Sequence, residues 1–254
     1  PPTNLIYEMF LDENGEKISK SIGNGISIEQ WLRYANPESL SYYMFLKPRS
    51  AKKLFFDIIP KSVDDYYSHL RKYHTEENDK KYNNPVWHIH KGLPPNFDIE
   101  INFNSIINLV SISNSTDKNI IWDFVNSYDN NLKKDFNEDL DKLIQHSINY
   151  YNDFILPNKN YSKVDETQKS IFIDILNFLE KLRTDVLPED IQKEIYEIGK
   201  KHNFENLRDF FRLIYRVLLG QDNGPRLGSF VKLYGIKNTC KLIEKIIKNG
   251  TLSK

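Results

Sequence analysis

The sequence predicts a mainly α protein, in which a small β-hairpin and a mixed segment precede an α-helical bundle or cage. Two patterns carry this prediction. Aromatic and branched residues flank an Asn-Gly pair near the start, whereas helical periodicity is almost continuous after about residue 103. The 254 residues, of which 39% are hydrophobic and 13% aromatic, suffice for one large domain or two ordinary ones. This composition excludes a disordered tail.

The first elements that we expect are a hairpin and two short helices. Residues 5–12 form the first arm of the hairpin, Asn14-Gly15 the turn, and residues 17–19 the second arm. A helix is expected from an N-cap at Ser27 to about residue 34. A second short helix is expected to follow over residues 37–46, since a proline suits its first turn.

The rest of the chain is expected to be helical after one further strand. Apolar residues 54–59 predict a short strand, and an apolar stripe from residue 61 predicts a helix. Breaker residues between 75 and 97 indicate the boundary between two structural units. Later helices are expected around the apolar stripes at residues 140–151, 171–182, 191–198 and 207–218, and over residues 236–248.

Overall charge does not indicate a function, because 35 basic residues balance 35 acidic ones. A surface for a polyanion therefore has to arise from local segregation of charge. Cys240 is the single cysteine, which excludes a disulfide framework and suits a reducing compartment, so we expect a cytoplasmic protein. The sequence has no 18-residue apolar run and no secretory pattern, and we expect no membrane partner. Because the chain opens without methionine on an apolar stretch, we expect a fragment.

The clearest chemical signal is Lys17-Ile18-Ser19-Lys20-Ser21, which follows the hairpin and precedes Gly23-Asn24-Gly25. Lysine is a compact charge on a flexible stem. Two lysines in one loop therefore suit a polyphosphate whose negative charge moves onto a leaving pyrophosphate. For these five residues alone, a solvated Lys/Ser loop is the competing interpretation.

This loop and its surroundings resemble the class I aminoacyl-tRNA synthetases. Residues 16–25 are similar to the KMSKS signature, with Ile18 in the methionine position. Residues 28–54 resemble the segment that follows this loop in class I lysyl-tRNA synthetases. Residues 215–221 and Gly224-Pro225-Arg226 resemble a further motif of that family. Glutamyl-tRNA synthetases show a looser form of this last motif and are the competing family.

The resemblance implies three segments. Residues 1–26 would be the end of a catalytic domain with its KMSKS-like loop, residues 27–100 a stem-contact-like α/β segment, and residues 101–254 an α-helical anticodon-binding domain. The parent would be a class I lysine–tRNA ligase that forms lysyl-adenylate with ATP, and with Mg²⁺ in the full-length enzyme. This part would bind tRNA(Lys) and recognise its U-rich anticodon.

The resemblance also implies that this chain alone is inactive. The ATP-binding His-x-Gly-His signature is absent from the sequence, and residues 88–92 have the wrong order for it. Lysine and ATP would therefore bind through a missing N-terminal domain. No metal site is predicted, because His88 and His90 alternate like strand residues and have no third ligand nearby. We expect no DNA partner.

The candidate site residues follow from the resemblance and from local charge. The catalytic candidates are Lys17 and Lys20, and the candidates for ATP phosphates are Lys17, Ser19, Lys20 and Ser21. The tRNA candidates are Lys47, Arg49, Lys52, Lys53, Arg212, Arg216, Gln221 and Arg226. Arg226 is the first choice for a base contact, because the family pattern places its loop near the first anticodon position.

Several alternatives stay open. Ion pairs with Asp209 or Glu205 compete with RNA contacts for the arginines, and a core position is the more natural one for Phe230. Seven basic residues against Glu244 follow from residue 226 onward, whereas acids concentrate at residues 129–141, which indicates opposed faces. The whole chain could also be a non-catalytic α-helical RNA-binding protein or a protein-interaction scaffold.

Overall fold

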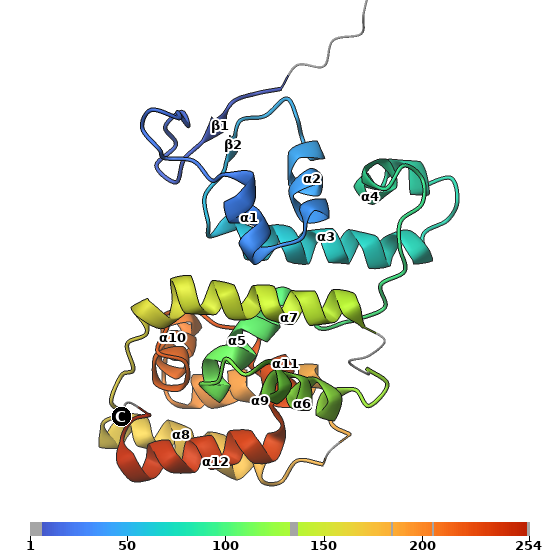
Figure 1. Ribbon diagram of the computed structural model, residues 1–254. Coiled ribbons are helices and arrows are strands. Elements are labelled where there is room, and N and C mark those ends of the chain that lie inside the picture. The colour runs from blue at the N-terminus through green and yellow to red at the C-terminus, as the bar shows by residue number, and fades with distance from the viewer. Residues whose placement is uncertain (1–6, 133–136, 184, 205, 253–254) are drawn as a thin grey trace, which may run out of the picture. The chain divides into compact units, whose positions relative to one another are not determined.

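The computed structural model describes residues 7–132, 137–183, 185–204 and 206–252. The chain divides into two compact units, residues 1–104 and 105–254, which we call the first and second units. The predicted mainly α class is confirmed, since helices dominate both units (Figure 1). Residues 5 and 6 of the expected hairpin, Glu205, Lys254 and part of the acidic segment lie outside the described residues.

The first unit combines a small β element with helices that pack on one another. Its described elements are β1 (Phe10–Leu11), α1 (Ile28–Tyr34), α2 (Pro37–Phe45), β2 (Lys52–Lys53), α3 (Ile58–Thr75), the 3-10 turn η1 (Lys81–Asn83) and α4 (Pro85–Ile89). The long helix α3 contacts both α2 and α4, and α2 also contacts α1 and α4 (Figure 1). Helices α2, α3 and α4, which are separated along the sequence, therefore all contact one another.

The capping signals of the sequence form as expected. The Ser27 side chain accepts a hydrogen bond from the N–H of Gln30, and the Gln30 side chain accepts one from the N–H of Ser27. At the start of α2, the Asn36 side chain accepts a hydrogen bond from the N–H of Ser39. Trp31 is buried, and its indole N–H donates to the Ser39 hydroxyl at 3.2 Å. The two predicted short helices are therefore confirmed.

The β element differs from the expected hairpin. Its turn forms, because Leu11 and Lys17 make an antiparallel bridge and the Ile18 N–H donates to the Phe10 carbonyl at 3.1 Å. The regular sheet, however, pairs β1 with β2 in parallel, with Phe10 opposite Lys52. The second strand thus comes from a segment about forty residues away, which local patterns do not indicate.

The strand predicted over residues 54–59 is wrong, because α3 begins at Ile58. Pro60 lies in the first turn of this helix, where its missing N–H breaks no helical hydrogen bond. Ile59 and Val63 are both buried and lie four residues apart, so they belong to one helical stripe. The strand was predicted because aromatic and β-branched residues, which are common in strands, are frequent in this segment.

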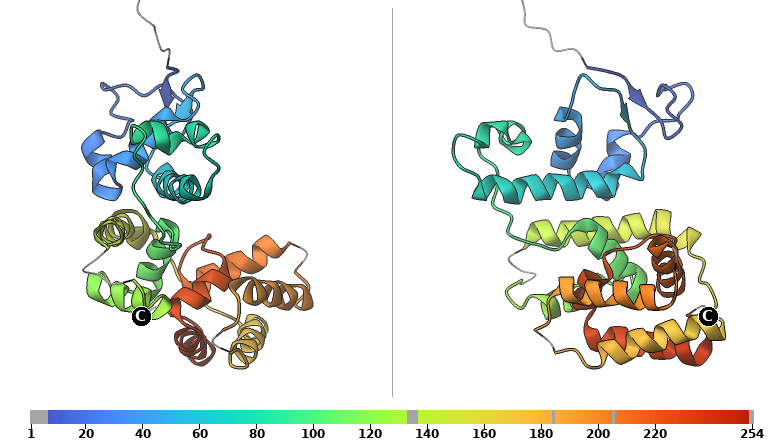
Figure 2. Two further views of the ribbon diagram at one scale, coloured as in Figure 1. Left: turned by 90° about the vertical axis from the view of Figure 1, so that its right-hand side faces the viewer. Right: turned by 180° about the vertical axis from the view of Figure 1, so that it is seen from behind.

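The second unit is entirely helical in its described part. Its elements are α5 (Phe103–Ser113, which starts at the end of the first unit), α6 (Lys118–Tyr128), α7 (Glu138–Tyr150), the π turn η3 (Tyr151–Ile155), the 3-10 turn η4 (Leu156–Asn158), α8 (Glu166–Leu179), α9 (Pro188–Lys201), α10 (Leu207–Leu218), α11 (Leu227–Tyr234) and α12 (Ile236–Asn249). Helix α8 lies alongside α12, and α11 packs against α9 and α6 (Figure 2).

The apolar stripes predicted for the later helices are largely buried, whereas α11 was not predicted. The buried stripe residues include Leu140, Leu143, Ile144, Ile148, Ile171, Phe172, Ile175, Leu179, Ile191, Ile195 and Ile198. Helix α11 escaped prediction because Gly228, in its first turn, was assigned to a loop. Among the described helices, none has both the length and the apolar character needed to cross a membrane.

Candidate functional site

The lysine-containing loop of residues 17–21, here called the KISKS loop, has its main chain fixed at Ser19. The N–H of Ser19 donates to the side-chain oxygen of Asn24 at 2.9 Å, and its carbonyl accepts from the N–H of Gly23 at 3.0 Å. Lys20 therefore lies in a turn whose preceding residue, Ser19, has both its main-chain N–H and its carbonyl hydrogen-bonded. The side chain of Asn24, from outside the loop, fixes the residue next to it.

The polar side chains of this loop lie together in one turn. Lys17 and Lys20 are exposed, and neither has an ion-pair partner among the residues that the structure describes. The hydroxyls of Ser19 and Ser21 lie 2.8 Å apart. The four residues predicted for phosphate binding thus form a set of two ammonium and two hydroxyl groups within five positions, which suits phosphate oxygens.

A buried carboxylate supports the start of the loop. Asp12 is only 7% exposed. It accepts hydrogen bonds from the N–H groups of Asn14 and Glu16 at 3.0 and 2.8 Å, and from the side-chain amide of Asn24 at 2.8 Å. These bonds, that of Asn24 foremost, lower the pKa of Asp12 because they stabilise its charged form. Neither Asp12 nor Asn24 was predicted as a site residue, although their positions on either side of the loop were a signal available in the sequence.

The structure divides the basic residues between positions 47 and 53 into two kinds. Lys47 and Arg49 are exposed and have no ion-pair partner in the described part of the chain. Lys52 instead donates to two main-chain carbonyls near the end of α2, at 2.8 and 3.1 Å, and burial lowers its pKa. Lys53 donates to a carbonyl of the hairpin turn at 2.9 Å. For stem phosphates, the geometry favours Lys47 and Arg49.

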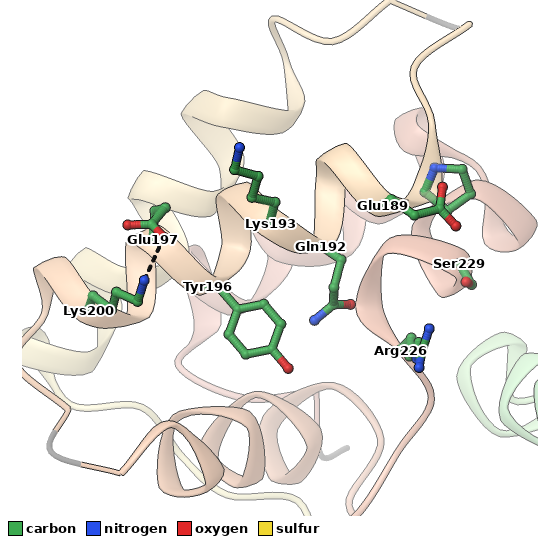
Figure 3. A pocket seen from close by; sticks show the side chains of 9 residues that line it. Glu189, Gln192, Lys193, Tyr196, Glu197, Lys200, Arg226 and Ser229 are labelled. Atoms are coloured by element: carbon green, nitrogen blue, oxygen red, sulfur yellow. Dashed lines mark hydrogen bonds and ion pairs between the residues drawn. The ribbon is translucent and has the colours of Figure 1, made fainter.

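The second unit contains a cleft of about 520 Å³ between α9 and the start of α11 (Figure 3). Arg226, the first choice for a base contact, is the N-cap residue of α11 and lines this cleft. Tyr196 and Gln192 project from α9 toward the side of the cleft on which Arg226 lies (Figure 3). The lining residues are Pro188, Glu189, Gln192, Lys193, Tyr196, Glu197, Lys200, Arg226 and Ser229.

Close approach of α11 to α9 shapes this cleft. A Cβ atom on Gly228 would lie 1.9 Å from the carbonyl oxygen of Pro188, so only glycine permits this packing. The Gly228 N–H donates to the side-chain oxygen of Gln192 at 3.0 Å. This bond leaves the NH₂ group of Gln192 as the donor available to a ligand, close to Arg226.

The loop before α11 is anchored by a tyrosine of α10. The Tyr215 hydroxyl donates to the carbonyl of Pro225 at 2.6 Å, immediately before Arg226. Burial, and then the nearby Tyr196, raise the pKa of Tyr215 to about 12, so the hydroxyl stays protonated and remains a donor. The main chain on either side of Arg226 is therefore hydrogen-bonded to α10 and to α9.

The cleft is lined by two positively charged side chains that form no ion pair within the described part of the chain. Arg226 and Lys193 have no ion-pair partner among the described residues, whereas Lys200 pairs with Glu197 at 2.7 Å. Tyr196 is 39% exposed and packs edge-on against another aromatic ring of the unit. A guanidinium, an amide NH₂ group and a partly exposed ring together suit an unpaired base, which is recognised by hydrogen bonds at its edge and by stacking.

The other two predicted arginines are engaged within the protein. Arg212 pairs with Asp209 at 3.3 Å, as the structural alternative expected. Arg216 makes a two-pronged ion pair with Asp222, with one of its contacts at 3.2 Å. Both pairs are exposed, so they do not prevent exchange for a phosphate.

Four further residues of the sequence analysis have structural partners. Gln221 is half-buried and donates to the Ser111 hydroxyl at 3.1 Å. Phe230 is buried, as the core interpretation expected. The strand-like interpretation of His88 and His90 is wrong, since residues 85–89 form α4, and both rings have hydrogen-bond partners. Within the described ranges there is no group of three His, Cys, Asp or Glu suited to a metal ion.

The α9 side of the cleft was not predicted from the sequence. Gln192, Lys193 and Tyr196 lie beside the buried stripe of α9, and they were left unassigned because their cleft partner is in another helix. Tyr196 is an aromatic residue outside the apolar stripe of an amphipathic helix. That position was the signal that could have selected it.

The first unit also matches the model of a known protein family. Residues 1–93, which include the KISKS loop and α1 to α4, match the family described as tRNA synthetases class I (K). Over 96% of its length, the chain is homologous to proteins named lysine–tRNA ligase. The predicted resemblance to class I lysyl-tRNA synthetases is therefore confirmed.

Three bacterial relatives show the extent of this homology. The identity is 49% over 247 residues to the lysine–tRNA ligase of Rickettsia bellii (strain OSU 85-389) and 49% over 246 residues to that of Rickettsia peacockii (strain Rustic). It is 48% over 246 residues to that of Rickettsia rickettsii (strain Sheila Smith). The chain spans about half the length of these relatives, 47% in each case.

Proposed function

We propose that this chain is part of a class I lysine–tRNA ligase. Its second unit binds tRNA(Lys) and reads the anticodon, and its KISKS loop serves the formation of lysyl-adenylate from lysine and ATP. The observation that carries this proposal is the identity of 49% over 247 residues, which extends through both the loop and the cleft. The lysine named for these relatives favours lysine over glutamate as the amino acid. A cytoplasmic location remains a prediction.

In adenylate formation, the lysine carboxylate attacks the α-phosphorus of ATP, and the bond to pyrophosphate breaks. Negative charge then accumulates on the departing pyrophosphate. The exposed ammonium groups of Lys17 and Lys20 would bind its oxygens, and each preorganised contact contributes about 2–4 kcal/mol of transition-state stabilisation. The hydroxyls of Ser19 and Ser21 add hydrogen bonds to phosphate. The residues that the structure describes include no group of three carboxylate, histidine or cysteine side chains suited to Mg²⁺.

In the second unit, the cleft at Arg226 would receive an unpaired anticodon base. The base would stack near Tyr196, while Arg226 and the amide of Gln192 donate to acceptors at its edge. The carbonyl groups of uracil are such acceptors, which fits a U-rich anticodon. In the first unit, Lys47 and Arg49 would contact phosphates of a tRNA stem, where they add affinity without sequence preference.

Binding of a tRNA(Lys) transcript to this chain tests the proposal. Arg226→Ala should weaken binding by about 1–3 kcal/mol, roughly 5- to 150-fold. The matched control is Arg183→Ala in the same unit, because the Arg183 side chain is 86% exposed and lies outside the cleft. Replacing an anticodon U should weaken binding to the native chain but not to Arg226→Ala. Equal losses for the two arginine variants would contradict anticodon recognition at this cleft.

A second measurement tests the catalytic part of the proposal. In the full-length protein, Lys20→Ala should depress adenylate formation far more than tRNA affinity, because the ammonium acts on the departing pyrophosphate. Equal losses in both would argue against the assignment. The 254-residue chain alone should show no ATP–pyrophosphate exchange. Exchange at rates near those of a complete synthetase would refute this expectation.

A further inference from the structure

The side chain of Asn24 connects the KISKS loop to a buried carboxylate. Its amide NH₂ donates to Asp12 at 2.8 Å and, more weakly, to the Lys17 carbonyl at 3.4 Å. Its amide oxygen accepts from the N–H of Ser19 at 2.9 Å. One planar group thus holds the main chain of the loop on both sides of Ile18.

Asp12 determines which way this amide faces. An ionised carboxylate only accepts hydrogen bonds, so it requires the NH₂ group of Asn24 and directs the amide oxygen toward Ser19. Asp12 is itself held by the N–H groups of Asn14 and Glu16 in the hairpin turn. The lowered pKa of Asp12 means that the carboxylate keeps its charge at neutral pH. The orientation of Asn24 is therefore built into the fold of the turn.

Packing of Ile18 against Gly25 also holds the main chain of the loop in place. A Cβ atom on Gly25 would lie 2.5 Å from Cγ2 of Ile18, so the residue that follows Asn24 has to be glycine for this contact to form. The carbonyl of Lys17, the side chain of Ile18 and the N–H of Ser19 are thus all engaged. Lys17 and Lys20 extend from this held segment as exposed side chains.

We infer that Asp12 and Asn24 are positioning residues, which hold the KISKS main chain so that Lys17 and Lys20 begin from fixed points when both meet the polyphosphate. The inference rests on the proposed function of the loop. Two ammonium groups on a freely moving loop would have to be ordered in the transition state, and prior ordering removes that entropic cost. The effect of Asn24 on catalysis should therefore operate through the lysines.

The first test concerns the loop itself and needs no enzymatic activity. In this chain, Asn24→Ala should accelerate hydrogen exchange of the Ser19 amide about 10-fold or more, because its acceptor is lost. Asn24→Asp should do the same, since it places a second carboxylate against Asp12. The matched control is Asn14→Ala, which changes an exposed side chain in the same turn and keeps the main-chain bond to Asp12. Unchanged Ser19 exchange in both Asn24 variants would overturn the inference.

The second test uses the full-length ligase. In lysine-dependent ATP–pyrophosphate exchange, Asn24→Ala should lower kcat roughly 10- to 100-fold and change KM for lysine less than about 2-fold. In a background that carries both Lys17→Ala and Lys20→Ala, the same change should lower kcat by less than about 3-fold, because both groups it positions are gone. Equal reductions of kcat in both backgrounds would indicate a merely structural role and would overturn the inference.

The two tests separate this inference from the proposed function. Should the native full-length protein show no lysine-dependent exchange, the proposed function of the loop fails, and with it the catalytic role of Asn24. The Ser19 measurement would still decide whether Asn24 holds the loop. Should exchange be present while Asn24→Ala matches the Asn14→Ala control, the proposed function stands and the positioning role fails.

Discussion

The KISKS loop and the cleft at Arg226 are held in place by different means. The loop depends on hydrogen bonds among side chains and main-chain groups between residues 12 and 25, so its supports are close in sequence. The cleft depends on the packing of α11 against α9, and its sides come from residues 188–200 and 226–229. We infer that the loop can change locally, whereas the cleft is tied to the stability of its unit.

This difference indicates how each site fails. Breaking a few hydrogen bonds within one small turn leaves the packed helices of the unit intact, so it should cost little global stability. Separating two packed helices exposes apolar surface and unfolds the structure that defines the cleft. Substitutions at the loop should therefore alter dynamics and catalysis, and substitutions beneath the cleft should alter folding. Three experiments examine this contrast.

The largest effect is expected at the contact between α11 and α9. In Gly228→Ala, the new Cβ atom would lie 1.9 Å from a main-chain oxygen, which cannot move without shifting a helix. The free energy of unfolding of the second unit, measured by urea denaturation, should fall by about 3 kcal/mol or more. The neighbouring Ser229→Ala, at an exposed position, is the matched control and should change it by less than about 0.5 kcal/mol. Similar values for the two variants would show that α11 packs differently.

Acid should weaken the second unit before it affects the Asp12 network. Burial, followed by the charges of Lys118 and Lys142, lowers the pKa of His146 on α7 to about 4. Neutral His146 makes its full contribution to stability above the pKa of the unfolded state. This contribution is lost as pH falls from about 6.5 to 4, because the histidine of the unfolded chain binds the proton first. The full loss should reach about 3 kcal/mol.

The Asp12 carboxylate should become protonated only at a lower pH than His146. Its folded pKa is depressed, so its contribution is present at neutral pH and is lost only as pH falls through that lowered value. At pH values near 5, the unfolding midpoint should therefore drop while Ser19 exchange stays protected. His146→Gln should remove much of that drop. An equal response to acid in the native chain and in His146→Gln would rule out this histidine as the cause.

The smallest effect on stability is expected at the loop. Gly25→Ala directs a methyl group into Ile18, whose side chain can rotate away, so the global free energy of unfolding should fall by about 1 kcal/mol or less. Ser19 should nevertheless exchange faster, because displaced Ile18 disturbs the neighbouring main chain. A loss of stability as large as that of Gly228→Ala would show that the loop and its unit fold as one piece.

The sequence identified the features that depend on neighbours along the chain. Ser27 and Pro37 mark helix starts because capping and proline geometry act within one turn. The apolar stripe of α9 followed from its period alone. The KISKS residues were selected from five consecutive positions, and their role in phosphate binding stays a prediction. The resemblance to class I synthetases likewise required only order and residue type.

Tertiary structure decided which of these segments meet. Periodicity tells which face of a helix is buried, but it does not name the neighbour that covers it. For this reason the parallel pairing of β1 with β2, the burial of Asp12 and the position of Tyr196 opposite Arg226 were beyond the sequence patterns. The strand predicted over residues 54–59 failed for the same reason, because packing against α2 and α4 selects a helix there over local β propensity.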